Sequence, residues 1–292
     1  MNNEVIPFFN IPDFLYAIHN PSKLNIFKKI ILLIYGKIVQ IFYKNTKEKT
    51  FCFFMNLLIR KNSGINFKDG FYFKNLISGL SIYYPNKRIT RIISSEENLF
   101  NLLFETYCLN LIEFSDDDVV VDCGANVGEL NYSFFYQGYK LKYIGIEPDP
   151  IVYNSLIKNI ISGKEQFFDC ALSDEIKTQK LFLATESADT SLEYAGQEKY
   201  EIIKTTTLDS LDLPRKIKLF KVEAEGHEPE VILGSLKTLK KIEFVSVDFG
   251  FERGLKAEST IVEVNKLLVE NNFELIALSD IRLIGLYKNI NI

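Results

Sequence analysis

The chain has 292 residues, of which 47% are hydrophobic and 25% are charged, and its formal net charge is -4. This composition is typical of a globular protein and excludes a disordered one. The negative net charge argues against a nucleic-acid partner, because general nucleic-acid binders neutralise phosphates with an excess of Lys and Arg. The chain has only two histidines, His19 and His227, which excludes zinc sites built on three histidines.

The cysteines and the start of the chain both bear on the cellular compartment. Four cysteines are scattered without paired spacing, which fits reduced thiols better than a disulfide framework or a zinc site. The first 20 residues lack the basic region, apolar core and cleavage site of a secretory signal. We therefore expect a cytoplasmic protein.

Residues 21–61 form a basic stretch, with nine Lys and Arg against the single acid Glu48. Within it, the apolar run 30–43 falls short of the ~20 residues that span a bilayer. One interpretation is a basic amphipathic helix that contacts a membrane surface or an anionic substrate, and the other is a helix packed on the main domain with solvated lysines. A role in homo-oligomer formation also remains open.

Residues 70–93 are rich in aromatic and β-branched side chains and are interrupted by the turn-forming residues Gly79 and Pro85. This pattern predicts short strands and turns. We define residues 1–93 as an N-terminal extension, basic and helical first and rich in strands afterwards. Residues 94–292 form the predicted main domain.

The main domain alternates apolar strands with helical segments. A helix is expected over residues 94–114. Fully apolar runs separated by helical stretches indicate a parallel sheet covered on both faces. After a helix near 259–271, two strands at 273–278 and 282–287 lie too close for a parallel crossover and should form an antiparallel hairpin. We predict an α/β fold with a doubly wound sheet and a C-terminal antiparallel hairpin, its parallel strands at 119–122, 143–147, 166–172, 219–223 and 242–248.

The strand 119–122 leads into a glycine-rich turn, Asp122-Cys123-Gly124-Ala125-Asn126-Val127-Gly128, before the next helix. Such a turn lets the backbone approach a ligand. A dinucleotide enzyme would carry G-x-G-x-x-G there, but Asn126 stands in place of the second glycine, and the carboxylate of Asp122 would repel a phosphate. A cationic or zwitterionic ligand suits the turn better than the nicotinamide cofactor of an oxidoreductase.

Further acids follow the next two strands. Glu147, nineteen residues after Gly128, is placed to accept hydrogen bonds from ribose hydroxyls, and Asp169 from an adenine amino group. Each acid alone is equally well explained as a solvated strand end. With Asp122 for the amino acid end and no triphosphate-binding loop in the sequence, the set predicts S-adenosylmethionine as the cofactor, bound by Asp122, Gly124, Asn126, Gly128, Glu147 and Asp169.

Four segments in this order resemble the FkbM family of S-adenosylmethionine-dependent methyltransferases: VVVDCGANVGE at 119–129, GIEPDP at 145–150, TTTLDSL at 205–211 and KVEAEGHEPEVILGS at 221–235. VSVDFGFERG at 245–254 resembles a subset of the family. The family usually shows Asp-x-Glu-Gly-x-Glu in the fourth segment, whereas this chain begins it with Glu223 and has His227 before the last acid. The resemblance covers residues 95–292 and implies a class I methyltransferase Rossmann-like fold. Family acceptors range over sugars, polysaccharide precursors, lipids and polyketides.

Methyl transfer to a hydroxyl needs a group that removes the proton, because an alcohol does not ionise unaided near neutral pH. Glu223 and Glu225 are two residues apart at a strand end and should share one face. In one version, a carboxylate or His227 is the general base. In the other, Glu223 and Asp248 hold Mg²⁺, as in metal-dependent sugar O-methyltransferases of similar layout, and Glu225 takes the proton.

These observations favour an O-methyltransferase acting on a sugar hydroxyl of a nucleotide-linked or glycan precursor, as in polysaccharide biosynthesis. The alternatives are a lipid or polyketide hydroxyl, an oxidoreductase, and a catalytically silent binding protein. The polar segment 186–200 is either an acceptor loop, with Thr190, Ser191 and Tyr194 contacting the sugar, or a plain surface connection.

Overall fold

A computed structural model of the chain describes residue 15 and residues 24–59, 64–93, 95–184, 190–194, 196 and 198–292. The chain divides into two compact units, Met1–Leu99 and Phe100–Ile292. The division falls within helix α4 (Glu96–Thr106), slightly beyond the boundary expected at residue 93. Each unit is described by itself.

The described part of the first unit includes helices and a small antiparallel sheet. Helices α2 (Ile26–Asn45) and α3 (Glu48–Leu58) precede the strands β1 (Ile65–Lys68), β2 (Phe71–Asn75) and β3 (Ser81–Tyr84), which pair in the order β1-β2-β3, and a short 3-10 helix η2 (Lys87–Ile92). The strands and turns expected over 70–93 are present. No helix in the described ranges is long and apolar enough to cross a membrane.

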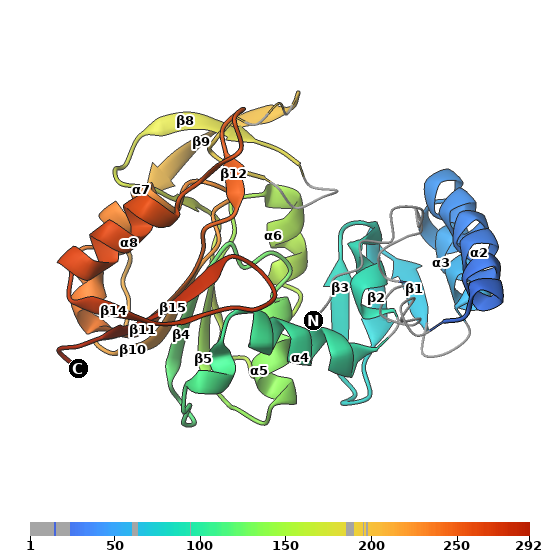
Figure 1. Ribbon diagram of the computed structural model, residues 1–292, viewed down its shortest axis with the longest axis horizontal. Coiled ribbons are helices and arrows are strands. Elements are labelled where there is room, and N and C mark those ends of the chain that lie inside the picture. Colours follow the sequence, from blue (N-terminus) through green and yellow to red (C-terminus); the bar gives the residue numbers. More distant parts are fainter. Residues whose placement is uncertain are drawn as a thin grey trace. The chain divides into compact units, whose positions relative to one another are not determined.

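The second unit is built on a seven-stranded sheet in the order β14-β15-β11-β10-β4-β5-β6 (Figure 1). Neighbouring strands from β11 to β6 are parallel, whereas β15 runs antiparallel to β11 and β14 antiparallel to β15. The predicted doubly wound sheet with its C-terminal hairpin is thereby confirmed. The strands are β4 (Val119–Cys123), β5 (Lys142–Ile146), β6 (Gln166–Phe168), β10 (Ile217–Val222), β11 (Ile242–Asp248), β14 (Phe273–Leu278) and β15 (Ile284–Asn289).

The strand expected over 166–172 is in fact two strands. β6 ends at Phe168, and β7 (Ala171–Leu172) leaves the main sheet to pair with β9 (Tyr200–Thr206), which also pairs with β8 (Thr178–Phe182). The sequence does not predict β8 and β9, because their residues are largely exposed and show no clear apolar alternation. The remaining elements are α5 (Glu129–Tyr136), α6 (Pro150–Leu156), α7 (Glu228–Leu233), α8 (Ile261–Glu270), the pair β12 (Phe251–Arg253) and β13 (Glu258–Ser259), and the 3-10 helices η3 (Leu109–Leu111), η4 (Leu208–Ser210) and η5 (Thr238–Lys241).

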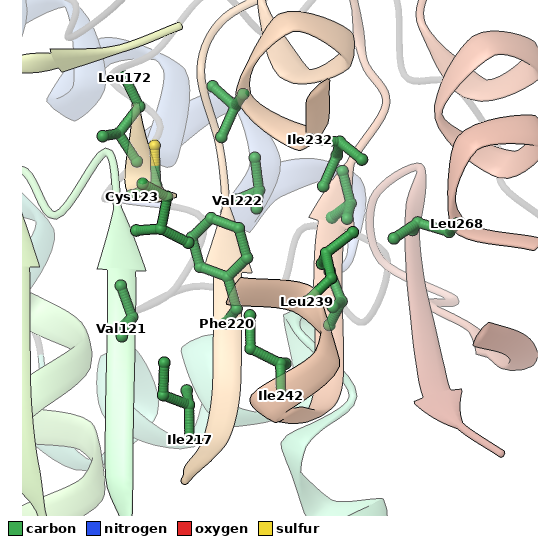
Figure 2. Packing of buried hydrophobic residues seen from close by; sticks show 14 of the residues in the cluster. Val121, Cys123, Leu172, Ile217, Phe220, Val222, Ile232, Leu239, Ile242 and Leu268 are labelled. Atoms are coloured by element: carbon green, nitrogen blue, oxygen red, sulfur yellow. The ribbon is translucent and has the colours of Figure 1, made fainter. Parts of the chain in front are cut away.

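A cluster of buried hydrophobic residues covers one face of the main sheet (Figure 2). Val121 of β4 and Phe220 of β10 are fully buried and belong to the same cluster as Ile232 of α7 and Leu268 of α8. Burying a side chain of this size contributes about 1.5–3 kcal/mol. Because successive strand residues face opposite sides, Asp122 and Lys221 lie on the other face. This alternation places two charged side chains inside the protein, next to the strand ends.

Candidate active site

The residues predicted to form the site lie at or directly after the carboxyl ends of the parallel strands. Gly124 follows β4, Glu147 follows β5, Asp169 follows β6 and Glu223 follows β10, while Asp248 ends β11. The carboxyl ends of parallel strands meet at one edge of the sheet. The chain order reverses at β4, which lies between β5 and β10, so this edge is also the topological switch point where such sheets bind ligands.

The turn 124–128 packs directly on the end of β10. Gly124 has a φ of 74°, and a Cβ atom there would lie 2.0 Å from the carbonyl oxygen of Glu223, so only glycine fits. Gly128 also has a positive φ, 84°, as does Asn126, 50°. Gly124 and Asn126 are half-exposed and line the edge, whereas Gly128 is buried beneath it.

Every backbone N–H group of the turn is hydrogen-bonded within the protein. Gly124 and Ala125 both donate to the carbonyl of Ile146, at 3.0 Å, and Gly128 donates to Ala125. Asn126 donates to Glu147 Oε2, and its own side chain accepts from Val127. No amide in residues 124–128 is left for a phosphate, which a dinucleotide-binding turn requires. The turn therefore does not fit the oxidoreductase alternative.

Glu147 lies beside the turn with its carboxylate held by two backbone N–H groups. Oε2 accepts from Asn126 and Oε1 from Asp149, both at 2.9 Å. A carboxylate oxygen has room for a second donor, so both oxygens retain acceptor capacity for two hydroxyls. Burial raises the pKa of Glu147 to about 7. Asp169, by contrast, is exposed at the end of β6, with its pKa raised by partial burial.

Asp122 does not lie where the sequence suggested. Its side chain is 1% exposed, so it offers no surface to a cofactor. It is the register partner of Lys221 on β10, with Oδ1 2.9 Å from Lys221 Nζ, and it accepts a hydrogen bond from the Tyr143 hydroxyl. We correct its expected role from binding the amino acid end of the cofactor to holding Lys221.

Lys221, which is not among the site residues predicted from the sequence, connects the strand ends from inside the protein. Its Nζ donates to the carbonyl of Gly124 at 2.8 Å and lies 3.1 Å from Glu223 Oε2. Burial alone would lower the pKa of Lys221, but Asp122, Tyr107 and Glu223 raise it well above its usual value. The sequence contains a signal for this role, because a lysine within the apolar strand 217–222 is expected to be buried and must then have buried partners.

Glu223 is surrounded by donors. It accepts a hydrogen bond from the Tyr107 hydroxyl, and its Oε1 lies 2.8 Å from Arg282 Nη1. Burial opposes ionisation, yet Lys221 and Arg282 lower the pKa of Glu223 to about 2. A carboxylate this acidic and this fully paired is a poor proton acceptor. The geometry thus does not support Glu223 as the general base.

The predicted Mg²⁺ pair, Glu223 and Asp248, is already bridged by a cation. Arg282, from the loop between β14 and β15, places Nη1 on Glu223 and Nη2 2.6 Å from Asp248 Oδ2. Burial and the neighbouring charge of Glu223 raise the pKa of Asp248 to about 6 despite the arginine. A guanidinium between the two carboxylates leaves no place for Mg²⁺, which needs oxygen ligands at close range. The donor set does not fit the metal.

The turn after β10 fixes the backbone of Glu225. Glu228 Oε1 accepts from the N–H groups of Ala224 and Gly226, at 2.9 and 3.1 Å. The Ser191 hydroxyl donates to the carbonyl of Glu225 at 2.8 Å. Glu225 itself has a φ of 51°, uncommon for a residue with a side chain, and is half-exposed.

His227 lies behind this turn and is 5% exposed. Its Nε2 is 3.0 Å from the Ser173 hydroxyl, and its Nδ1 is 2.9 Å from Glu193 Oε1. Both ring nitrogens therefore face protein groups, and an acceptor hydroxyl has no access to them. The structure gives His227 a supporting role in place of the catalytic one expected from the sequence.

Glu193, His227 and Glu230 are a group of three potential metal ligands in the described ranges, with ligand atoms within 4.8 Å of one another. Arg253 already pairs with Glu230 through both guanidinium nitrogens, at 2.9 and 2.6 Å. The guanidinium of Arg253 thus occupies the position beside Glu230, as the guanidinium of Arg282 occupies the position beside Glu223.

The expected acceptor segment is described only in part, because residues 185–189, 195 and 197 lie outside the described ranges. Thr190 donates to Asp149 Oδ2 at 3.1 Å, and Ser191 is 4% exposed. Tyr194 is 46% exposed, with its ring 5.1 Å from that of Phe182. Of the three side chains proposed to contact a sugar, Tyr194 is the most accessible.

Comparisons with known proteins bear on the family to which the chain belongs. A family model described as the Methyltransferase FkbM domain matches residues 122–275, more than half of the chain. A curated relative, Methyltransferase 1 of Beauveria bassiana (strain ARSEF 2860), is 26% identical over 157 residues, which cover 50% of this chain and 59% of that protein. The match thus spans less than two thirds of the relative's length.

Solved structures with a similar arrangement include a SAM-dependent methyltransferase from Aquifex aeolicus, with 14% identity, a TM-score of 0.40, and coverage of 66% of this chain and 95% of that one. Another is a putative RNA methyltransferase PH1948 from Pyrococcus horikoshii, with 16% identity, a TM-score of 0.37, and coverage of 65% and 82%. The strand order and C-terminal hairpin are those of the class I methyltransferase fold that the sequence resemblance implied. The chain therefore belongs to the FkbM methyltransferase family.

Proposed function

We propose that the chain is an S-adenosylmethionine-dependent O-methyltransferase that methylates a sugar hydroxyl in a nucleotide-linked or glycan precursor. The cofactor assignment is carried by the turn 124–128. All backbone N–H groups of this turn are hydrogen-bonded within the protein, and the turn lies beside the carboxylate of Glu147, which can still accept hydrogen bonds. This arrangement suits a nucleoside that carries no phosphate. The cofactor supplies an electrophilic methyl group when bound.

Different residues at the sheet edge would bind different parts of the cofactor. Glu147 would accept from the two ribose hydroxyls, and the exposed Asp169 from the adenine amino group. Gly124 and Asn126 would let the cofactor approach the backbone. Several carboxylates line this edge, which favours a ligand with a positive sulfonium and a positive amino group.

We assign proton removal to Glu225. Glu223 has its pKa lowered to about 2 by Lys221 and Arg282, and His227 is buried behind the turn. Glu225 is half-exposed, and its backbone is held in place by Glu228 and Ser191 through the contacts described above. A positioned carboxylate that takes the hydroxyl proton is worth ~100-fold or more in rate.

A polyhydroxyl acceptor is supported by the polar groups near the strand ends. Glu225, Glu252 and Tyr194 are at least partly exposed and can accept or donate hydrogen bonds, as a sugar requires. A lipid or polyketide acceptor would need an apolar lining and is the second candidate. A nucleic-acid acceptor is disfavoured by the net charge of -4.

We place the activity in the cytoplasm. Cys52, Cys108, Cys123 and Cys170 are all free, as expected of a protein kept in a reducing compartment.

The proposal is tested by incubating the full chain with methyl-labelled S-adenosylmethionine and a panel of nucleotide sugars, glycans and long-chain alcohols. We expect label to enter a sugar, and the product to be an O-methyl ether. Glu225→Gln should lower kcat by ~100-fold or more with an unchanged cofactor Kd, because the amide cannot accept the proton. Glu270→Gln, at an exposed position of α8, is the matched control and should leave kcat unchanged.

Two results would count against parts of the proposal. Transfer to the alcohols and to no sugar would overturn the acceptor class. Near-normal turnover by Glu225→Gln would remove Glu225 from the mechanism while leaving the cofactor site intact.

A further inference from the structure

Helix α2 (Ile26–Asn45) is apolar on the face that it exposes. Seven large apolar side chains are between 41% and 75% exposed: Ile26, Phe27, Ile30, Ile31, Ile34, Ile38 and Ile41. With 3.6 residues per turn they fall within an arc of about 140°. The buried residues Leu32, Gly36 and Val39 lie on the opposite side. A helix on the surface of a globular protein normally presents polar residues there.

The apolar face is long and continuous. Residues 26, 30, 34, 38 and 41 follow one another at intervals of three or four, from the first to the last turns of a helix of 20 residues. Such a helix is about 30 Å long. On α3, Phe53 and Leu57 are also 63% and 52% exposed and are one turn apart. Contiguous exposed apolar surface of this extent marks an interaction site.

The charges of α2 are all positive. Lys28, Lys29, Lys37 and Lys44 are its only charged residues. Helical spacing places Lys37 and Lys44 at one edge of the apolar face and Lys28 beyond the other. An apolar face flanked by lysines matches an anionic lipid surface. Two copies of α2 packed face to face would instead bring like charges together, which disfavours a second copy of this chain as the partner.

We propose that α2 binds in the plane of an anionic membrane surface, with its exposed isoleucines among the lipid chains and its lysines at the phosphate groups. The helix lies on the bilayer and does not cross it, in agreement with the lack of a spanning helix in the described ranges. This surface lies entirely within the first unit, so the proposal is independent of the methyl-transfer chemistry.

The test is flotation of the full chain with lipid vesicles, one set of phosphatidylcholine alone and one an equimolar mixture of phosphatidylcholine and phosphatidylglycerol. We expect binding to the anionic vesicles that weakens as salt rises, and much weaker binding to the neutral ones. The double variant Ile30→Ser/Ile34→Ser should lower the vesicle partition constant by about 100-fold, since each buried isoleucine contributes about tenfold. Because both side chains are exposed, the variant should fold normally.

Ile77→Ser is the matched control, because Ile77 is 89% exposed and belongs to the same unit but not to α2. It should bind vesicles like the wild type. Lys37→Glu/Lys44→Glu should weaken binding to anionic vesicles and leave the weak binding to neutral ones unchanged. The proposal is overturned if the wild type fails to float with anionic vesicles, or if Ile30→Ser/Ile34→Ser floats as well as the wild type. It is also overturned if sedimentation shows a homodimer that this variant disperses.

Discussion

Lys221 is the residue whose removal should disturb the site most, and the structure allows the effect to be worked out. Lys221→Met keeps much of the side-chain length but removes the charge that lies 2.9 Å from Asp122 and 3.1 Å from Glu223. Asp122 is then buried without its cation. Breaking a buried ion pair in this way costs about 3–5 kcal/mol. In a domain of this size each kcal/mol lowers Tm by about 2–4 °C, so we expect a fall of about 6–20 °C.

The loss of stability in Lys221→Met should depend on pH. Burial already raises the pKa of Asp122 above its ordinary value, and without Lys221 that pKa rises further. The folded variant then binds a proton that the unfolded chain, with an ordinary Asp, has released. Stability therefore falls as pH rises from about 4 towards neutrality. The deficit relative to wild type should be larger at pH 8 than at pH 5.

Urea denaturation at the two pH values measures this deficit. The double variant Lys221→Met/Asp122→Asn should recover much of the loss at pH 8, because no unpaired buried charge remains at position 122. Lys240→Met, at an exposed position, is the control and should change stability little. A Lys221→Met protein as stable as wild type, or a deficit equal at both pH values, would refute the reasoning.

Three further predictions concern the strand ends. Gly124→Ala should destabilise the protein by several kcal/mol, because its Cβ would overlap the end of β10; Gly138→Ala, with a φ of 92° but open space around it, should cost only ~1–2 kcal/mol in thermal melts. Affinity for S-adenosylmethionine should fall about tenfold between pH 8 and pH 6, because the pKa of Glu147 is raised to about 7 by burial and ribose hydroxyls bind the ionised form. Calorimetry should show this dependence, which Glu147→Gln should abolish; a flat wild-type profile would contradict it. Methyl transfer should be unaffected by EDTA, because Arg282 holds the position between Glu223 and Asp248; loss of activity that Mg²⁺ restores would show a required metal.

The main sheet could be predicted because its strands are short apolar runs and its last two strands are too close for a crossover. The glycine-rich turn and Glu147 were likewise predictable, since a turn at the switch point and an acid after the next strand are local features. The pair β8 and β9 could not be predicted in this way. Its residues are mostly exposed, and the run 166–172 predicts a single strand although β6 and its neighbour β7 are separate.

The roles of the charged residues depend on contacts between distant parts of the chain. Arg282 and Glu223 are 59 residues apart, and no local pattern shows that a loop arginine reaches that carboxylate. Asp122 looked like a ligand because it ends a strand before a glycine turn. In the fold it is a buried strand residue beside Lys221, so its partner is set by strand register. The chemistry of His227 predicts a catalytic role, whereas its burial depends on contacts with the distant Ser173 and Glu193.

Calorimetric titration of the full chain with S-adenosylmethionine, and separately with NAD, tests the assignment of the sheet edge most directly. We expect S-adenosylmethionine to bind at one site per chain, and Glu147→Gln to weaken that binding at pH 8 by at least tenfold. We expect no heat from NAD, because the turn 124–128 has no free amide for its pyrophosphate. Binding of NAD at this edge, or no binding of S-adenosylmethionine to the folded chain, would contradict the assignment.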